Sequence, residues 1–122
     1  MIDLTSFASL RVRGGFVIAA VELSQAPLRD ALGRDAVAQT RVIGRELHMT
    51  LRFGQDDQEL SVTLYHEVLE AATVASASPP HCVLEFNESD FERAARAAHA
   101  RWGPASPENL DHMLKFYDFE GE

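Results

Sequence analysis

Cysteine is nearly absent from this chain, and its absence limits how the fold can be stabilised. The single cysteine, Cys82, has no second thiol in the chain with which to form a disulfide. Disulfides are typical of secreted proteins and are rare in reducing compartments. We therefore expect a cytoplasmic protein. We interpret Cys82 as a small buried apolar side chain rather than as a metal ligand or a nucleophile.

Basic residues are also scarce, with 11 Lys and Arg against 19 Asp and Glu and a formal net charge of −8. Proteins that bind nucleic acid need clustered Lys and Arg to neutralise phosphates, so we expect no nucleic-acid partner. No apolar run is long enough to span a bilayer, and residues 1–5 lack the basic start and apolar core of a signal peptide. We therefore expect no membrane partner either.

The composition is that of an ordinary globular protein, with 46% hydrophobic and 25% charged residues. The 122 residues suffice for one domain with its own core. We predict a single domain over residues 1–122, divided into a mainly sheet region over 1–58, a motif helix over 59–77 and C-terminal helices over 88–117. The expected fold class is α+β, with a small mixed or antiparallel sheet followed by three helices.

Strand patterns dominate the first half of the chain. Residues 10–13 and 16–23 flank a Gly-Gly pair, which is typical of a hairpin, and the apolar start of the second run predicts a central strand. Residues 46–53 alternate between apolar and polar side chains, so we predict a strand with one buried face. We predict a short helix over 27–32, whereas residues 36–43 fit either a strand or a helix.

Helical patterns dominate the second half. We predict helices over residues 60–77 and 91–102, and a final helix that begins with Ser106 as its N-cap and Pro107 in its first turn. Residues 81–86, which follow two prolines, are expected to form a short strand or an extended link.

The helix predicted over 60–77 is apolar nearly all round, which indicates a buried helix, but one stripe of it is ionisable. His66 and Glu70 are four residues apart and share a face, with Glu67 at its edge. Buried ionisable groups are costly unless they are paired, hydrogen-bonded or bound to a metal. The pattern H-E-x-x-E differs by one residue from the H-E-x-x-H of zinc peptidases, whose central Glu is a general base. We therefore predict Zn²⁺ ligands at His66 and Glu70 and a general base at Glu67.

The order of the elements adds a family resemblance to this motif. A strand, a polar turn, the helical segment TLYHEVLEA, a loop and the helical segment FERAARAAH together resemble the minimal zincin-like metallopeptidase domains of bacteria and phages. The resemblance covers roughly residues 45–102. It implies a third zinc ligand on the second of these helices, a Glu in a pattern E-x-x-A, which corresponds here to Glu92. The family has His where this chain has Glu70.

Glu92 has a structural alternative. Ser89-x-x-Glu92 fits a capping box, in which the Glu92 side chain would bond to the backbone at the start of its helix. In that case His99 or His81 becomes the better candidate for a third ligand. His99 lies on the same helical face as Glu92, and His81 follows two prolines.

The motif and the resemblance together predict a zinc-dependent metallopeptidase of the minimal zincin type. In that reaction a metal-activated water attacks a peptide carbonyl, and Glu67 accepts its proton. The partner would be a protein or peptide, bound as an extended segment at the edge of the sheet. The replacement of the second His leaves another hypothesis open: a catalytically inactive binding or regulatory module with a structural metal or a polar cluster.

Overall fold

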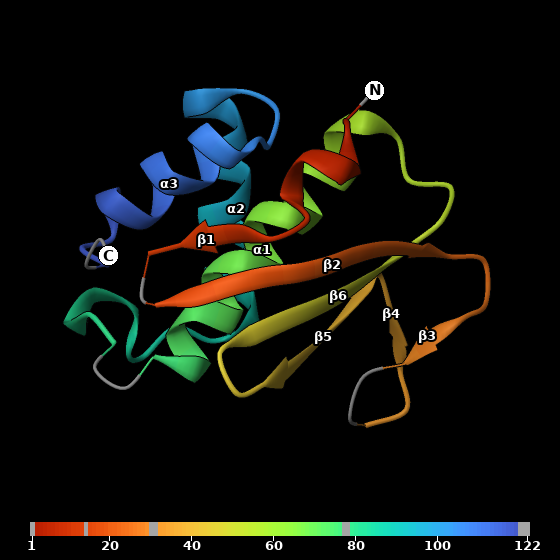
Figure 1. The fold of residues 1–122 in the computed structure, drawn as a ribbon, viewed down its shortest axis with the longest axis horizontal. Helices are drawn as coiled ribbons and strands as arrows, with labels where there is room; N and C mark the ends of the chain where they lie inside the picture. The colour runs from red at the N-terminus through yellow and green to blue at the C-terminus, as the bar shows by residue number, and fades with distance from the viewer. Residues whose placement is uncertain (1, 14, 30–31, 77–78, 120–122) are drawn as a thin grey trace.

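A mixed four-stranded sheet and three helices make up most of the computed structural model, which describes residues 2–13, 15–29, 32–76 and 79–119 (Figure 1). This confirms the predicted α+β class, with the sheet preceding the helices. In chain order the elements are η1 (Leu4–Phe7), β1 (Leu10–Val12), β2 (Phe16–Ser24), β3 (Leu28–Arg29), β4 (Asp35–Ala36), β5 (Ala38–Ile43), β6 (Glu46–Arg52), α1 (Asp57–Ala75), η2 (His81–Val83), α2 (Glu88–Trp102) and α3 (Pro107–Phe116).

The main sheet has the strand order β1-β2-β6-β5. The two inner strands, β2 and β6, are parallel, and each pairs with an antiparallel edge strand. The prediction of a central strand after the Gly-Gly pair is thus confirmed by β2. The region that fitted either a strand or a helix forms β4 and β5, and β5 is an edge strand. The separate β3–β4 ribbon lies beside β5 (Figure 1).

The prediction of a helix over 27–32 is wrong where the structure describes it. Leu28–Arg29 forms β3 and pairs in antiparallel register with Asp35–Ala36, and the Leu28 side chain is buried. Gly33 has a φ of +79°, a conformation that suits a tight turn and not a right-handed helix. Cross-strand pairing and this turn therefore outweigh the local helix propensity. Residues 30–31 lie outside the described residues.

The link before α2 also differs from the prediction. It opens with the 3₁₀ turn η2 rather than with a strand, and the Cys82 side chain is exposed rather than buried. Val83 takes the buried position instead, with no exposed surface. The tight turn directs the Val83 side chain into the core. Of residues 81–86, which were predicted to be a strand or an extended link, only Val83 is buried.

Helix α1 is the centre of the core, as its nearly continuous apolar surface predicted. Its Leu64, Tyr65 and Val68 are fully buried, together with Leu47 and Leu51 of β6. Two polar groups in this core have partners: the Tyr65 hydroxyl donates to the carbonyl of Gly103 at 2.8 Å, and Ser61 Oγ lies 2.8 Å from His99 Nδ1. These contacts fix α1 against α2 and leave one stripe of α1 facing β5. Among the described helices, none combines the length and apolar character needed to cross a bilayer.

Candidate metal centre

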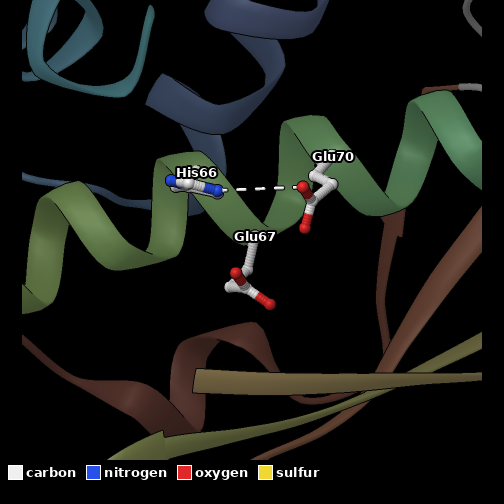
Figure 2. Close-up of side chains that lie close together, drawn as sticks. All are labelled: His66, Glu67 and Glu70. Atoms are coloured by element: carbon white, nitrogen blue, oxygen red, sulfur yellow. Dashed lines mark ion pairs between the residues drawn. The ribbon is translucent and has the colours of Figure 1, made fainter. Parts of the chain in front are cut away.

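One turn of α1 presents the three side chains of the H-E-x-x-E motif together. His66, Glu67 and Glu70 each offer one ligand atom, and these atoms lie within 4.8 Å of one another. His66 Nε2 and Glu70 Oε2 are 3.9 Å apart, while the Glu67 side chain points from the helix toward the sheet (Figure 2). The His66 side chain is 13% exposed. The spacing in the sequence therefore predicted this grouping, because all three residues come from one helix.

Helix α2 adds two carboxylates, one on each nitrogen of the His66 ring. Glu92 Oε1 lies 3.0 Å from Nδ1, and Glu88 Oε2 lies 3.1 Å from Nε2. Glu88 is on the same side of the ring as Glu70, and the two carboxyl groups hydrogen-bond each other. The imidazole is therefore held from both sides, with Glu70 and Glu88 gathered at Nε2.

The carboxylate of Glu92 bridges two basic groups. One oxygen contacts His66 Nδ1, and the other lies 2.8 Å from Nη2 of Arg96, one turn further along α2. The alternative in which Glu92 caps its own helix is not the observed arrangement. The capping box consists of Asn87 and Asp90, because α2 begins at Glu88, three residues before the predicted start. Glu92 therefore lies in the second turn, where its side chain can reach α1.

Glu67 is held by a strand rather than by the other members of the motif. Thr40 Oγ1 on β5 donates a hydrogen bond to Glu67 Oε1 at 2.8 Å. Burial raises the pKa of the Glu67 carboxyl above its ordinary value, and the Thr40 hydrogen bond and His66 oppose this effect. A half-buried carboxyl with a raised pKa beside a candidate metal ligand has the properties of a general base.

Burial and neighbouring carboxylates together raise the pKa of Glu70 to about 8. The hydrogen bond with Glu70 lowers the pKa of Glu88, since the Glu70 carboxyl donates its proton to the Glu88 carboxylate. Two carboxyl groups that share a proton in this way avoid the repulsion of two adjacent negative charges. A divalent cation would relieve the same repulsion and would displace that proton.

The other predicted candidates lie elsewhere. His99 Nδ1 is bonded to Ser61, which is five residues before His66 on α1 and so points about 140° away around the helix. His81 is exposed on η2. Glu88 is the residue that the sequence interpretation missed. Its signal was the spacing Glu88–Glu92, four residues apart, which places both on one face once α2 is known to begin at Glu88.

The cluster forms part of the wall of an open groove of about 830 Å³ between α1, the start of α2 and the edge strand β5. Its donor set of one imidazole and several carboxylates fits zinc, which accepts both ligand types and keeps an open position at catalytic sites. The described part of the chain contains no buried side-chain N or O atom without a hydrogen-bond partner. The residues therefore have suitable donor atoms for a metal, and their polar groups also hydrogen-bond one another.

Comparison with known proteins finds no match for this chain among protein-family models, curated proteins or solved structures. The resemblance to minimal zincin-like domains stays a prediction based on the motif and the order of elements. Glu92 as a zinc ligand likewise stays a prediction. What the site can do has to be inferred from its own geometry.

Proposed function

We propose that this chain is a zinc-dependent metallopeptidase of the minimal zincin type. The observation that supports it best is the gathering of Glu70 and Glu88 at Nε2 of His66, with Glu67 beside them. Zinc peptidases hold their metal with three protein ligands and leave the fourth position open. His66, Glu70 and Glu88 supply such a set from two helices.

Glu92 acts in this proposal as the residue that orients His66. A metal-bound imidazole nearly always donates its second N–H to a carboxylate or a carbonyl, which fixes the tautomer and the ring plane. Glu92 lies at that second nitrogen and is itself held by Arg96. This assignment differs from the one carried over from the family resemblance, in which Glu92 is the third ligand.

The chemistry that zinc supplies when bound is a lowered pKa for a coordinated water and a polarised substrate carbonyl. Glu67 accepts the proton of the water that attacks the peptide carbon and returns it to the leaving nitrogen. Thr40 holds the Glu67 carboxyl through the 2.8 Å hydrogen bond, and burial raises the pKa of this carboxyl above its ordinary value. Catalysis thus depends on a strand residue as well as on the motif helix.

The substrate in this proposal is an extended protein or peptide segment that adds to the edge of the sheet at β5. Arg52 N–H donates to the Val37 carbonyl at 2.8 Å, so these two residues form a hydrogen-bonded pair in the antiparallel ladder. Such pairs alternate along the ladder. The backbone groups of Ala38, Thr40 and Val42 therefore point outward from the sheet, beside Glu67.

A second function is supported by a different observation. The hydrogen bonds of His66 to Glu88 and Glu92, and of Thr40 to Glu67, satisfy the cluster without a metal. The same fold could then be an inactive binding or regulatory module, in which these residues stabilise the packing of α1 against α2 and β5. This module would bind protein segments at the same groove.

We propose a cytoplasmic location for either function. Cys82 is a free, exposed thiol. A lone accessible thiol is compatible with a reducing compartment, where such groups stay reduced.

The test of the peptidase proposal is the substitution Glu67→Gln, which keeps the shape of the side chain and removes its basicity. We expect the variant to retain zinc but to cleave a fluorogenic peptide library at least ~10²-fold more slowly than the wild type, because general-base catalysis contributes that much. The matched control is Glu85→Gln, an exposed glutamate in the loop before α2, which should cleave like the wild type. Zinc-loaded wild-type protein that cleaves nothing would instead support the inactive module.

A further inference from the structure

Exposed apolar side chains are concentrated along the groove. Four of the large aliphatic side chains that are exposed in the described residues line it: Leu32 (76% exposed), Val37 (42%), Val42 (42%) and Val74 (75%). Single exposed apolar residues need no explanation, but a set that lines one concave surface marks a binding site. The groove therefore has apolar walls on either side of the charged cluster.

Two links between β5 and α1, one through Gln55 and one direct, show that these elements run side by side in the same direction. At one end, Gln55 bonds both to Thr63 of α1, at 2.7 Å, and to the carbonyl of Val37, at 3.4 Å. The next contact joins Thr40 to Glu67. Later residues of the strand therefore meet later residues of the helix.

The next step along both elements is apolar. Two residues of a strand advance ~6.7 Å and four residues of a helix advance ~6 Å, so Val42 reaches the same level as Ala71. Ala71 and Val74 follow Glu67 at the i+4 and i+7 positions, on the same helical face. Val42, Ala71 and Val74 together line the groove immediately beyond Glu67. These three residues are called the apolar subsite below.

The edge of β5 determines what kind of ligand lies over this subsite. In the described sheet β5 pairs with β6 on one side only, and the outward backbone groups of Thr40 and Val42 lie at its open edge. An extended peptide can satisfy such groups with its own backbone. Its side chains alternate, so one of them points toward α1 at the level of Val42.

The β3–β4 ribbon adds charged side chains to the lining of the groove. Arg29 and Asp35 form an ion pair on the β3–β4 ribbon, and the positive charge of Arg34 acts on Glu88 across the groove. The groove thus combines the apolar subsite with charged side chains of the ribbon and of the cluster.

We propose that the apolar subsite selects protein segments that carry a large aliphatic or aromatic side chain next to the peptide bond held beside Glu67. The inference rests on the proposed function at one point, the placement of the peptide bond beside Glu67. The preference for an apolar side chain applies to the inactive module as well. Burying a leucine side chain against the three apolar residues strengthens binding relative to glycine by on the order of tenfold.

The test measures peptide binding rather than turnover. The probes are fluorescein-labelled octapeptides of Ser, Thr, Gly and Gln with one central position varied among Leu, Gly and Glu. Binding is followed by fluorescence anisotropy on Glu67→Gln protein without added metal, so that cleavage does not interfere. We expect the Leu peptide to bind about tenfold more tightly than the Gly peptide. Equal affinities, or no binding of any probe, would overturn the inference.

A charge placed in the subsite should change the preference. Val74→Lys in the same Glu67→Gln background should weaken binding of the Leu peptide and strengthen binding of the Glu peptide, because the lysine replaces an apolar contact with a positive charge. Val74 is largely exposed, so the substitution leaves the core intact. Leu84→Lys, at an exposed leucine that does not line the groove, is the matched control and should keep the Leu preference. An unchanged preference in Val74→Lys would also overturn the inference. Zinc content and peptide cleavage are measured in separate experiments. If those experiments contradict the peptidase proposal, the peptide-binding results still test this inference.

Discussion

His66 has a different environment at each of its ring nitrogens, and this difference assigns roles to the surrounding carboxylates. Nε2 faces Glu70 and Glu88, whereas Nδ1 faces Glu92, which is also paired with Arg96. A metal at Nε2 would therefore have two carboxylates within reach, and Glu92 would stay on the far side of the ring. In the proposed metal site the two glutamates of α2 therefore have different roles, although they are one helical turn apart.

This difference predicts unequal effects of two conservative substitutions on zinc affinity. Loss of an orienting carboxylate costs about 10–100-fold in metal affinity, so Glu92→Gln should fall in that range. Glu88→Gln removes a proposed ligand and should cost more. Competition titration against a chromophoric zinc chelator measures both. A larger loss for Glu92→Gln than for Glu88→Gln would instead make Glu92 the third ligand.

Spacing alone predicted the members of the cluster that share one helix, whereas those on other elements could not be derived from spacing; Glu92 was named only through the family resemblance. The spacing of His66, Glu67 and Glu70 determines that they share a face, whatever the rest of the fold. Glu88 reaches His66 only because α2 begins at that residue and lies against α1. Thr40 likewise reaches Glu67 across 27 positions of sequence. Such contacts depend on tertiary packing, which local spacing does not encode.

At the scale of elements, the start of α2 determines the position of the site. Asn87 accepts a hydrogen bond from the Asp90 N–H at 2.9 Å, and Asp90 accepts one from the Asn87 N–H at 3.0 Å. This capping box begins the helix early enough to include Glu88 in its first turn. The sequence offered a competing box at Ser89 and Glu92, since both patterns have the same spacing.

Substitution of the two competing caps separates these arrangements. Asn87→Ala should lower the free energy of unfolding by about 1 kcal/mol, because the first turn of α2 loses the side chain that accepts its N–H group. Ser89→Ala is the matched control: Ser89 is exposed within the first turn, so its loss should have little effect. Urea denaturation followed by circular dichroism measures both. A greater loss of stability in Ser89→Ala would contradict the observed cap.

Regular patterns allowed most elements to be predicted, and short elements were the exceptions. Alternation predicted β6, a continuous apolar surface predicted α1, and the Ser106–Pro107 pair predicted the start of α3, where Ser106 Oγ accepts from the Asn109 N–H. The strand β3 has only two residues, too few to show a period. Its strand conformation comes from pairing with β4, which is a property of the ribbon rather than of either segment.

At the scale of the whole molecule, the site lies where three separate parts of the chain meet. Edge strand β5, the buried helix α1 and the first turns of α2 each contribute a side chain to the cluster. Figure 1 labels these three elements, and Figure 2 shows the side chains that α1 contributes. The sequence predicted the α+β class and the order of sheet and helices, because these follow from local patterns. It left open whether a third ligand converges on His66 and Glu70, because that depends on how the helices pack.

The most direct test of the account is the zinc content of the purified protein, measured by elemental analysis after purification without a chelating column. We predict about one zinc per chain in the wild type and none in His66→Ala, because the imidazole is the central member of the ligand set. His112→Ala, at an exposed histidine on α3, is the matched control and should keep its zinc. A wild type that takes up no zinc at neutral pH, or a His66→Ala protein that keeps it, would contradict the metal site.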